Sequence, residues 1–210
     1  MTDAGVQPPR TNRRGDATRE SMLEAALQAL ATGDPGAVSA NRIAKQIGAT
    51  WGVVQYQFGD ADGLWAAVLH RTAEHRADVF QQTSASAPLR DRVAAIIDTL
   101  YDGLTATDSK AIENLRAALP REPAELERLY PRTAAELQSW GRGWLTTCQN
   151  AFTGLAVDPA RVQEVATLIP GAMRGITSER QLGSYFDLDM ARRGLTNAIV
   201  AYLEASDADG

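Results

Sequence analysis

The sequence contains little of what metal and redox sites are built from. It has one cysteine, Cys148, and two histidines, His70 and His75, among 210 residues. A single cysteine forms no disulfide within the chain and no cysteine zinc site. The spacing of the histidines does not place two imidazoles on one helix face. We therefore expect no bound metal, and we expect Cys148 to be a small buried side chain, the alternative being a redox-sensing thiol.

Long apolar runs are also missing. No stretch approaches the length of about eighteen apolar residues that a membrane-spanning helix needs. Residues 1–16 are polar and contain no apolar segment of the kind found in a secretory signal. The sequence therefore predicts a cytoplasmic protein with no membrane partner.

Signatures of catalysis are missing as well. The sequence holds no nucleophile elbow and no carboxylate cluster joined to a histidine at a metal-like spacing. Gly141-Arg142-Gly143 lacks the third glycine and the preceding strand of a dinucleotide site. We expect no catalytic residues and no cofactor, so a helical enzyme is a rival without support from the residues.

The composition that remains favours helices. Aromatic residues make up 6% of the chain, apolar residues 44% and charged residues 22%, and runs of β-branched residues are missing. Alanine and leucine are frequent, and both are strong helix formers. A chain of this length buries a sizeable core as one large domain or two small ones. We expect an all-α fold.

Charge is distributed unevenly. The formal net charge is -5, yet residues 1–58 contain six basic and five acidic groups, a net of +1. The remainder carries a net of -6. Any contact with nucleic acid must therefore come from a local arrangement of side chains rather than from bulk charge.

Apolar residues at helical spacing, separated by caps and turns, predict the helices. The first begins near Asp16 or Thr18 and ends at the turn 32–36, and a short helix follows Ser39 and ends at Gly48. The other expected helices are Trp51–Gln57, 61–83, 90–106, 108–118, 123–153, 158–180 and 187–206. The inward positions expected in the first four are Met22, Leu23, Ala26, Leu27, Leu30, Ile43, Ala44, Ile47, Val54, Phe58, Leu64, Val68 and Leu69.

The segment Ser39–Phe58 carries the most informative pattern. Two short helices joined by a tight turn need a small residue where their backbones approach, and Ala44 supplies it. Gly48, four positions later, tolerates the left-handed backbone of the turn. The second helix then presents a face that fits the major groove of DNA. This spacing alone is also compatible with an ordinary packed helix pair.

The wider context resembles the TetR family of regulators. The family pattern I-A-x-x-x-G-V-S-x-G-T-L-Y-x-H-F-x-S-K-E-x-L corresponds here to Ile43–Leu64, and the resemblance covers about residues 16–70. Three positions depart from it: Gln55 stands where the family has Tyr, Gln57 where it has His, and Ala61 where it has Lys. The missing Lys removes one phosphate contact and predicts a shallower salt dependence of DNA binding.

The resemblance implies an N-terminal three-helix helix-turn-helix domain followed by an α-helical ligand-binding and dimerisation domain. The expected divisions are an arm at 1–15, a DNA-binding domain at 16–60 and a helical domain at 61–210. Arg13 and Arg14 belong to the arm, which either follows DNA or is a solvated tail. The DNA-contacting residues implied are Arg13, Arg14, Ser39, Asn41, Arg42, Thr50, Trp51, Gly52, Val53, Gln55, Tyr56 and Gln57.

Aromatic and apolar residues recur at intervals of four on one helix face. These are Trp140, Trp144, Cys148 and Phe152. Plain core packing explains them, and so does the wall of a ligand pocket, where apolar side chains dominate. The full set expected to bind a ligand is Tyr101, Leu104, Leu115, Leu119, Trp140, Trp144, Cys148, Phe152 and Met173.

In the resembling family the last two helices pair with their copies. Small residues such as Gly171, Gly175, Gly194 and Ala198 permit that close approach, although burial within one subunit explains part of the pattern. The resemblance thus implies a homodimeric, nucleoid-associated repressor, released from a palindromic double-stranded operator by a small hydrophobic effector. The alternative is a helical small-molecule-binding or scaffold protein whose helix-turn-helix does not bind DNA.

Overall fold

The computed structural model describes residues 13–34, 39–46, 48–77, 87–183 and 185–205. These residues form helices and no strands, which confirms the all-α expectation. The helices are α1 (Arg13–Ala31), α2 (Ala40–Gln46), α3 (Trp51–Phe58), α4 (Ala61–Ala77), α5 (Leu89–Gly103), α6 (Thr107–Ala118), α7 (Pro123–Leu129), α8 (Pro131–Ala151), α9 (Pro159–Gln181) and α10 (Leu188–Glu204).

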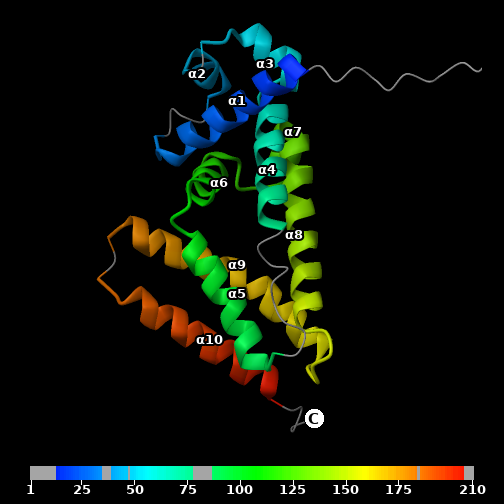
Figure 1. The fold of residues 1–210 in the computed structure, drawn as a ribbon, viewed down its shortest axis with the longest axis vertical. Coiled ribbons are helices and arrows are strands. Elements are labelled where there is room, and N and C mark those ends of the chain that lie inside the picture. The colour runs from blue at the N-terminus through cyan, green and yellow to red at the C-terminus, as the bar shows by residue number, and fades with distance from the viewer. Residues whose placement is uncertain (1–12, 35–38, 47, 78–86, 184, 206–210) are drawn as a thin grey trace, which may run out of the picture.

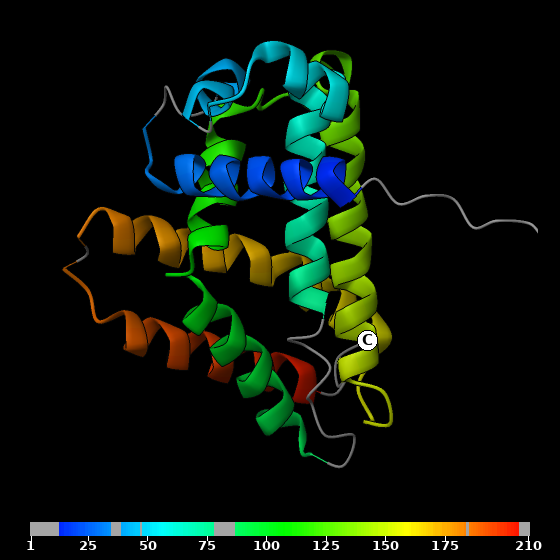
Figure 2. The same ribbon diagram turned by 45° about the horizontal axis from the view of Figure 1, so that its top comes forward.

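The helices are arranged along one long axis (Figure 1). α1, α2 and α3 lie together at one end, and α5, α9 and α10 lie at the other. α4 and α8 run side by side between these ends, and α6 lies next to α1. Figure 2 shows α1 crossing in front of α4. α8 therefore extends from the end that holds α3 to the end that holds α9.

The first hydrophobic core joins α1–α4 to α6. Met22 and Leu27 of α1, Ile43 of α2, Val54 of α3 and Leu64 of α4 are all at most 1% exposed. Burial of such side chains stabilises the fold by roughly 1.5–3 kcal/mol each. The inward positions expected from the sequence in these helices are buried here, apart from Ile47, which lies outside the described residues.

The second core lies at the opposite end of the molecule. It is formed by α5, α9 and α10, with Phe152 after the end of α8. Val93 and Ile97 of α5 meet Ile169 of α9 and Ile199 of α10 in it. Trp140 of α8 packs on the first core, whereas Trp144, one turn later, packs on the second. α8 is thus in contact with both cores.

Two predicted boundaries are wrong. α1 begins at Arg13 rather than at Asp16 or Thr18, so Asp16 lies in its first turn, where a carboxylate interacts favourably with the helix dipole. The expected helix 123–153 is two helices that separate at Tyr130, with φ -136° and ψ 61°. Pro131 favours the break, because proline disfavours helical backbone at the preceding residue and lacks an N–H.

The remaining boundaries lie within a few residues of those expected. α4 is described as far as Ala77, and the predicted continuation 78–83 lies outside the described residues. Pro170 lies inside α9 without ending it. Within the described part of the chain, no helix combines the length and the apolar character that crossing a membrane requires.

Candidate nucleic-acid interface

A tight turn joins α2 to α3. Gly48 has φ +68°, the left-handed conformation that glycine adopts without strain, and the Ala49 amide donates to the carbonyl of Ala44 at 2.8 Å. Ala44 is 1% exposed, as a close approach of the two helices requires. At the start of α2, Ser39 Oγ accepts from the Arg42 amide at 3.4 Å. The roles expected for Ala44 and Gly48 in the turn are confirmed, and Ser39 lies directly before α2, as expected.

The N-terminal end of α3 is open to solvent. Thr50 is its N-cap, with extended backbone at φ -93° and ψ 160° and a side chain that makes no capping hydrogen bond. The carbonyl of Thr50 accepts from Val53 and Val54, and Thr50 and Gly52 are exposed. The first amides of a helix have no partner within it. This end therefore offers a hydroxyl, backbone amides and a positive helix end to a phosphate.

Fewer residues of α3 are exposed to solvent than the sequence predicts. Gln55 is exposed, and Tyr56 has 79% of its surface in solvent. Trp51 and Val53 are half-buried and pack against the first core, where their apolar surface is removed from water. Gln57 is half-buried and donates from Nε2 to the carbonyl of Gly15 at 3.2 Å. The residues fully presented by this helix are therefore Gly52, Gln55 and Tyr56.

Charge around this face is sparse. α3 contains no charged residue. On α2, Asn41, Arg42 and Lys45 are exposed, and Arg42 Nη1 forms an ion pair with Asp34 at 2.6 Å. Arg13 and Arg14 lie in α1, but their side chains are outside the described residues. A phosphate that approaches Arg42 must compete with the carboxylate of Asp34.

Two arginines hold the C-terminal end of α3. Arg19 of α1 donates from Nη1 to the carbonyl of Gln57 at 2.9 Å and lies 4.5 Å over the ring of Phe58. Arg132 of α8 donates from Nη1 to the carbonyl of Phe58 at 3.0 Å. Cations at a helix C-terminus are stabilising. Sequence reasoning missed both residues. Arg19 lies in an ordinary helical pattern, and Arg132 is separated from Phe58 by 74 positions.

Comparison with known proteins places this geometry in a structural class. No protein-family model matches the chain, and no curated protein matches its sequence. Among solved structures, a TetR-family transcriptional regulator from Rhodococcus sp. superposes with a TM-score of 0.65 and 20% identity, over 90% of this chain and 100% of that one. The chain has the TetR fold. The helix-turn-helix described above is the N-terminal part of that fold.

Two further structures share the TetR fold. The multidrug binding protein EbrR, solved in complex with imidazole, gives a TM-score of 0.65 and 19% identity over 97% of this chain and 100% of that one. A TetR-family regulator (SCO0857) from Streptomyces coelicolor A3 gives a TM-score of 0.51 and 16% identity, over 96% of this chain and 100% of that one. The likeness extends through the C-terminal helices, well beyond residues 16–70 from which it was first inferred.

The residues expected to bind a ligand divide between the two cores of the TetR fold. Leu115, Leu119 and Trp140 belong to the first core. The second core contains Tyr101, Leu104, Trp144, Phe152 and Met173. Trp144 donates from Nε1 to the carbonyl of Ala166 at 2.6 Å. A groove of about 490 Å³ lies elsewhere, on the exposed side of α9 beside Gln163 and Glu164, and none of the expected residues lines it.

Cys148 lies between these two groups on α8 and is 1% exposed. Burial raises the pKa of its thiol to about 12. The described residues contain no group of histidine, cysteine and carboxylate side chains that would hold a metal. His70 instead lies on the exposed side of α4, with Nδ1 3.6 Å from Glu136 of α8.

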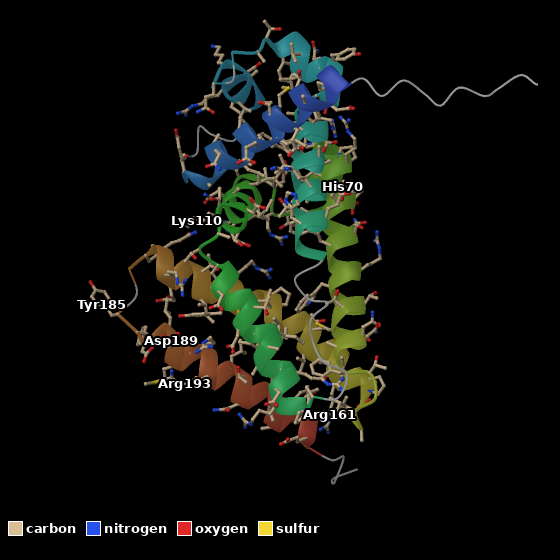
Figure 3. The ribbon with its side chains drawn as sticks, in the orientation of Figure 1. His70, Lys110, Arg161, Tyr185, Asp189 and Arg193 are labelled. Atoms are coloured by element: carbon tan, nitrogen blue, oxygen red, sulfur yellow. The ribbon has the colours of Figure 1, made fainter. Side chains whose placement is uncertain are left out.

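The outer side of α9 and α10 combines small and large apolar residues. Gly171, Gly175, Gly194 and Ala198 are exposed, and Leu168 and Tyr202 are 55% and 44% exposed. Figure 3 shows Tyr185 at the turn between the two helices, pointing away from the body of the protein. A surface with small residues at its centre allows two helices to approach closely.

Proposed function

We propose that the chain is a DNA-binding transcriptional regulator of the TetR type and that α3 reads double-stranded DNA. The observation that carries this proposal is the open N-terminal end of α3, next to the exposed Gln55 and Tyr56, on a helix-turn-helix at one end of the molecule. A glutamine amide pairs with the edge of adenine. The hydroxyls of Thr50 and Tyr56 donate to phosphates and set the position of the helix on the duplex.

The proposed regulator is a homodimer. Its proposed divisions are an arm at 1–15, of which residues 13–15 already belong to α1, a DNA-binding unit at 16–60, and a ligand-binding and dimerisation unit at 61–210. The exposed small residues of α9 and α10 support pairing of these helices with those of a second copy. A two-fold dimer presents two copies of α3 to successive major grooves about 34–36 Å apart, so the operator is palindromic.

The proposed effector is a small hydrophobic molecule that releases the repressor from its operator. The aromatic residues of α8, Trp140 and Trp144, support this because Trp140 packs on the first core and Trp144, one turn later, packs on the second. EbrR, which has the same fold, is a multidrug binding protein seen with imidazole. A ligand that favours a different separation of the two α3 helices weakens DNA binding by about 5–150-fold, the usual range for such coupling.

Selection from a random duplex library tests the proposal. The wild-type protein is expected to enrich a palindromic sequence. Gln55→Ala is expected to bind the enriched DNA about 5- to 150-fold more weakly, since a specific base contact contributes roughly 1–3 kcal/mol. Gln149→Ala, an exposed glutamine on α8 remote from α3, serves as the matched control and is expected to bind like wild type. Failure of the wild-type protein to enrich any sequence would contradict the proposal.

A second candidate function has its own support in the sparse charge near α3. The ion pair of Arg42 with Asp34 and the lack of charge on α3 suit a helical small-molecule-binding or scaffold protein whose helix-turn-helix does not bind DNA. That candidate predicts no enriched sequence and equal, weak binding to every duplex at low salt. The same selection therefore decides between the two functions.

A further inference from the structure

The N-terminal end of α8 is capped by a residue of another helix. Tyr130, its N-cap, makes no side-chain capping hydrogen bond. Asp62 of α4 takes that role: Oδ2 accepts from the Arg132 amide at 2.9 Å, and Oδ1 accepts from the Thr133 amide at 2.9 Å. Oδ1 also accepts from Thr133 Oγ1 at 2.7 Å. The start of α8 is therefore fixed to the start of α4.

Asp62 is ionised in this position. The carboxylate is 6% exposed, and burial alone raises its pKa, but the hydrogen bonds from Thr133 and Arg132 outweigh burial and leave the pKa below the ordinary value. A negative charge at the first turn of a helix is also favoured by the helix dipole. The negative charge of Asp62 on α4 thus faces the positive N-terminal end of α8.

Arg132 extends this joint to α3. Besides donating to the carbonyl of Phe58, its guanidinium lies 3.3 Å from Asp62 Oδ2 through Nε and contacts Asp60 through Nη2. One side chain of α8 therefore holds the end of α3, the turn after it and the first turn of α4. The planar fork of an arginine makes such a three-way contact, and the point charge of a lysine does not.

Gly63 leaves the space that this contact needs. A Cβ built at Gly63 would lie 2.5 Å from Arg132 Nη1 and closer still to the carbonyl oxygen of Phe58. Real Cβ atoms do not approach other atoms so closely. Any side chain at this position would displace either the guanidinium or the end of α3.

The opposite end of α8 is held by a buried cation. Arg92 of α5 is 3% exposed and donates from Nη1 to the carbonyls of Ala151 and Thr153 at 2.9 and 2.8 Å. α8 thus has a carboxylate from α4 at its N-terminus and a guanidinium from α5 at its C-terminus, as its dipole favours. A helix fixed at both ends and packed on both cores transmits a displacement along its length.

We propose that Arg132 is the positioning residue through which α8 sets the orientation of α3 on the body of the protein. The proposal rests on the function proposed above, and it adds the route by which the C-terminal domain controls DNA recognition. α6 also reaches the helix-turn-helix, since Asn114 donates to the carbonyl of Leu30 at 2.7 Å, but that contact is with the end of α1. Arg132 contacts α3 itself, at the end opposite to the one offered to DNA.

Hydrogen–deuterium exchange without DNA tests this joint directly. In Arg132→Gln, the amides of α3 and Gly59 are expected to exchange on the order of tenfold faster than in wild type, while α9 and α10 keep their wild-type rates. Arg128→Gln, an exposed arginine of α7, removes the same charge nearby and is expected to match wild type. Unchanged exchange in α3, or an equal acceleration across the whole chain, would overturn the proposal.

Affinity for duplex DNA enriched by the wild-type protein gives the functional test. Arg132→Gln is expected to bind it on the order of tenfold more weakly than wild type, while its binding to scrambled duplex is unchanged. The affinity of Arg132→Lys for the enriched duplex is expected to lie between those of wild type and Arg132→Gln. Wild-type affinity in Arg132→Gln would overturn the positioning role. A wild-type protein that enriches no sequence would instead refute the proposed function, and the exchange experiment would still decide whether Arg132 holds α3.

Discussion

Tyr56, on the outer face of α3, is 79% exposed. A large exposed side chain of this kind usually has a use. Its hydroxyl suits a phosphate and its ring suits a sugar or a base edge, and phosphate contacts carry no sequence information. Tyr56→Phe and Tyr56→Ala therefore separate two possible contributions to the free energy of DNA binding.

We expect Tyr56→Phe to weaken binding to selected and scrambled DNA by the same factor, about 2- to 10-fold, because one hydrogen bond contributes roughly 0.5–1.5 kcal/mol. Tyr56→Ala should weaken DNA binding more than Tyr56→Phe does, and its loss of affinity should be larger for the selected sequence than for the scrambled one. Titration of both variants against both duplexes at one salt concentration measures this. A loss confined to the selected sequence in Tyr56→Phe would assign the hydroxyl to a base.

Asp62 predicts a specific dependence of stability on pH. Its pKa in the folded protein lies below the unfolded value of about 3.9, so its ionised form stabilises the fold fully above that value. The contribution is lost as pH falls through the folded pKa. Asp62→Asn removes it and leaves an amide facing N–H donors, at a cost of about 1–3 kcal/mol near pH 7.

Urea unfolding between pH 3 and pH 8 checks this prediction. The difference in free energy of unfolding between wild type and Asp62→Asn should be constant above about pH 5 and should shrink as pH falls below about 4. Asp102→Asn, an exposed aspartate of α5, is the matched control and should change the free energy of unfolding little. A difference that persists unchanged to pH 3 would show that Asp62 is not the group that titrates.

The buried position of Cys148 predicts that its thiol is unreactive in the folded protein. Burial raises its pKa to about 12, so the reactive thiolate is rare at neutral pH. We expect a thiol reagent such as iodoacetamide to leave the folded protein unmodified at pH 7 and to react once urea unfolds it. Mass spectrometry of the labelled peptide measures the extent. Rapid labelling of the folded protein would instead support a redox-sensing thiol.

At the scale of the element, the junction of α3, α4 and α8 depends on the absence of a side chain at Gly63. In a helix interior, alanine is favoured over glycine by about 1 kcal/mol. Gly143 of α8 is exposed with nothing within 4 Å of a built Cβ, whereas a Cβ at Gly63 collides with Phe58 and Arg132. The two glycines therefore form a matched pair in which the same substitution has opposite effects.

We expect Gly143→Ala to raise the free energy of unfolding by about 0.4–1 kcal/mol. Gly63→Ala should lower it by about 1–3 kcal/mol, as overpacking of a full site does. Chemical denaturation of both variants gives the two values. Stabilisation by Gly63→Ala would contradict the close approach of Phe58 and Arg132 to this position.

The helices that local signals define were predictable from the sequence. Ser39, Gly48 and Asp60 act on residues within four positions, and the apolar spacing of α1 to α4 is regular. The break at Tyr130 was missed, although Pro131 signalled it, because apolar periodicity continues across both helices. The start of α1 was misplaced because a helix tolerates Gly15 in its first turn.

The contacts of Arg132 with α3 and α4 could not be predicted from local sequence signals. Its partners Phe58, Asp60 and Asp62 lie at least 70 positions away, and only tertiary packing brings them together. The division of the expected ligand residues between two cores has the same origin. A repeat of four residues shows that Trp140 and Trp144 share a helix face, but not which neighbouring helix each contacts.

At the scale of the whole molecule, the net charge of -5 and the uncharged surface of α3 limit how strongly the protein attracts DNA. Arg42 and Lys45 are the exposed cations described on α2. Two copies of each give about four phosphate contacts in a dimer, for which the slope of log affinity against log salt is about -3.6. Contacts from Arg10, Arg13 and Arg14 of both arms would steepen it to about -9.

Fluorescence anisotropy of the selected duplex over a series of salt concentrations, with a scrambled duplex of equal length as control, measures whether α3 reads DNA. A regulator that reads DNA through α3 should show at least about a thousandfold preference for the selected sequence at physiological salt, and a slope of log affinity against log salt nearer -3.6 than -9. Equal affinity for the two duplexes at every salt concentration would contradict this prediction, and would leave a TetR fold whose helix-turn-helix does not read DNA.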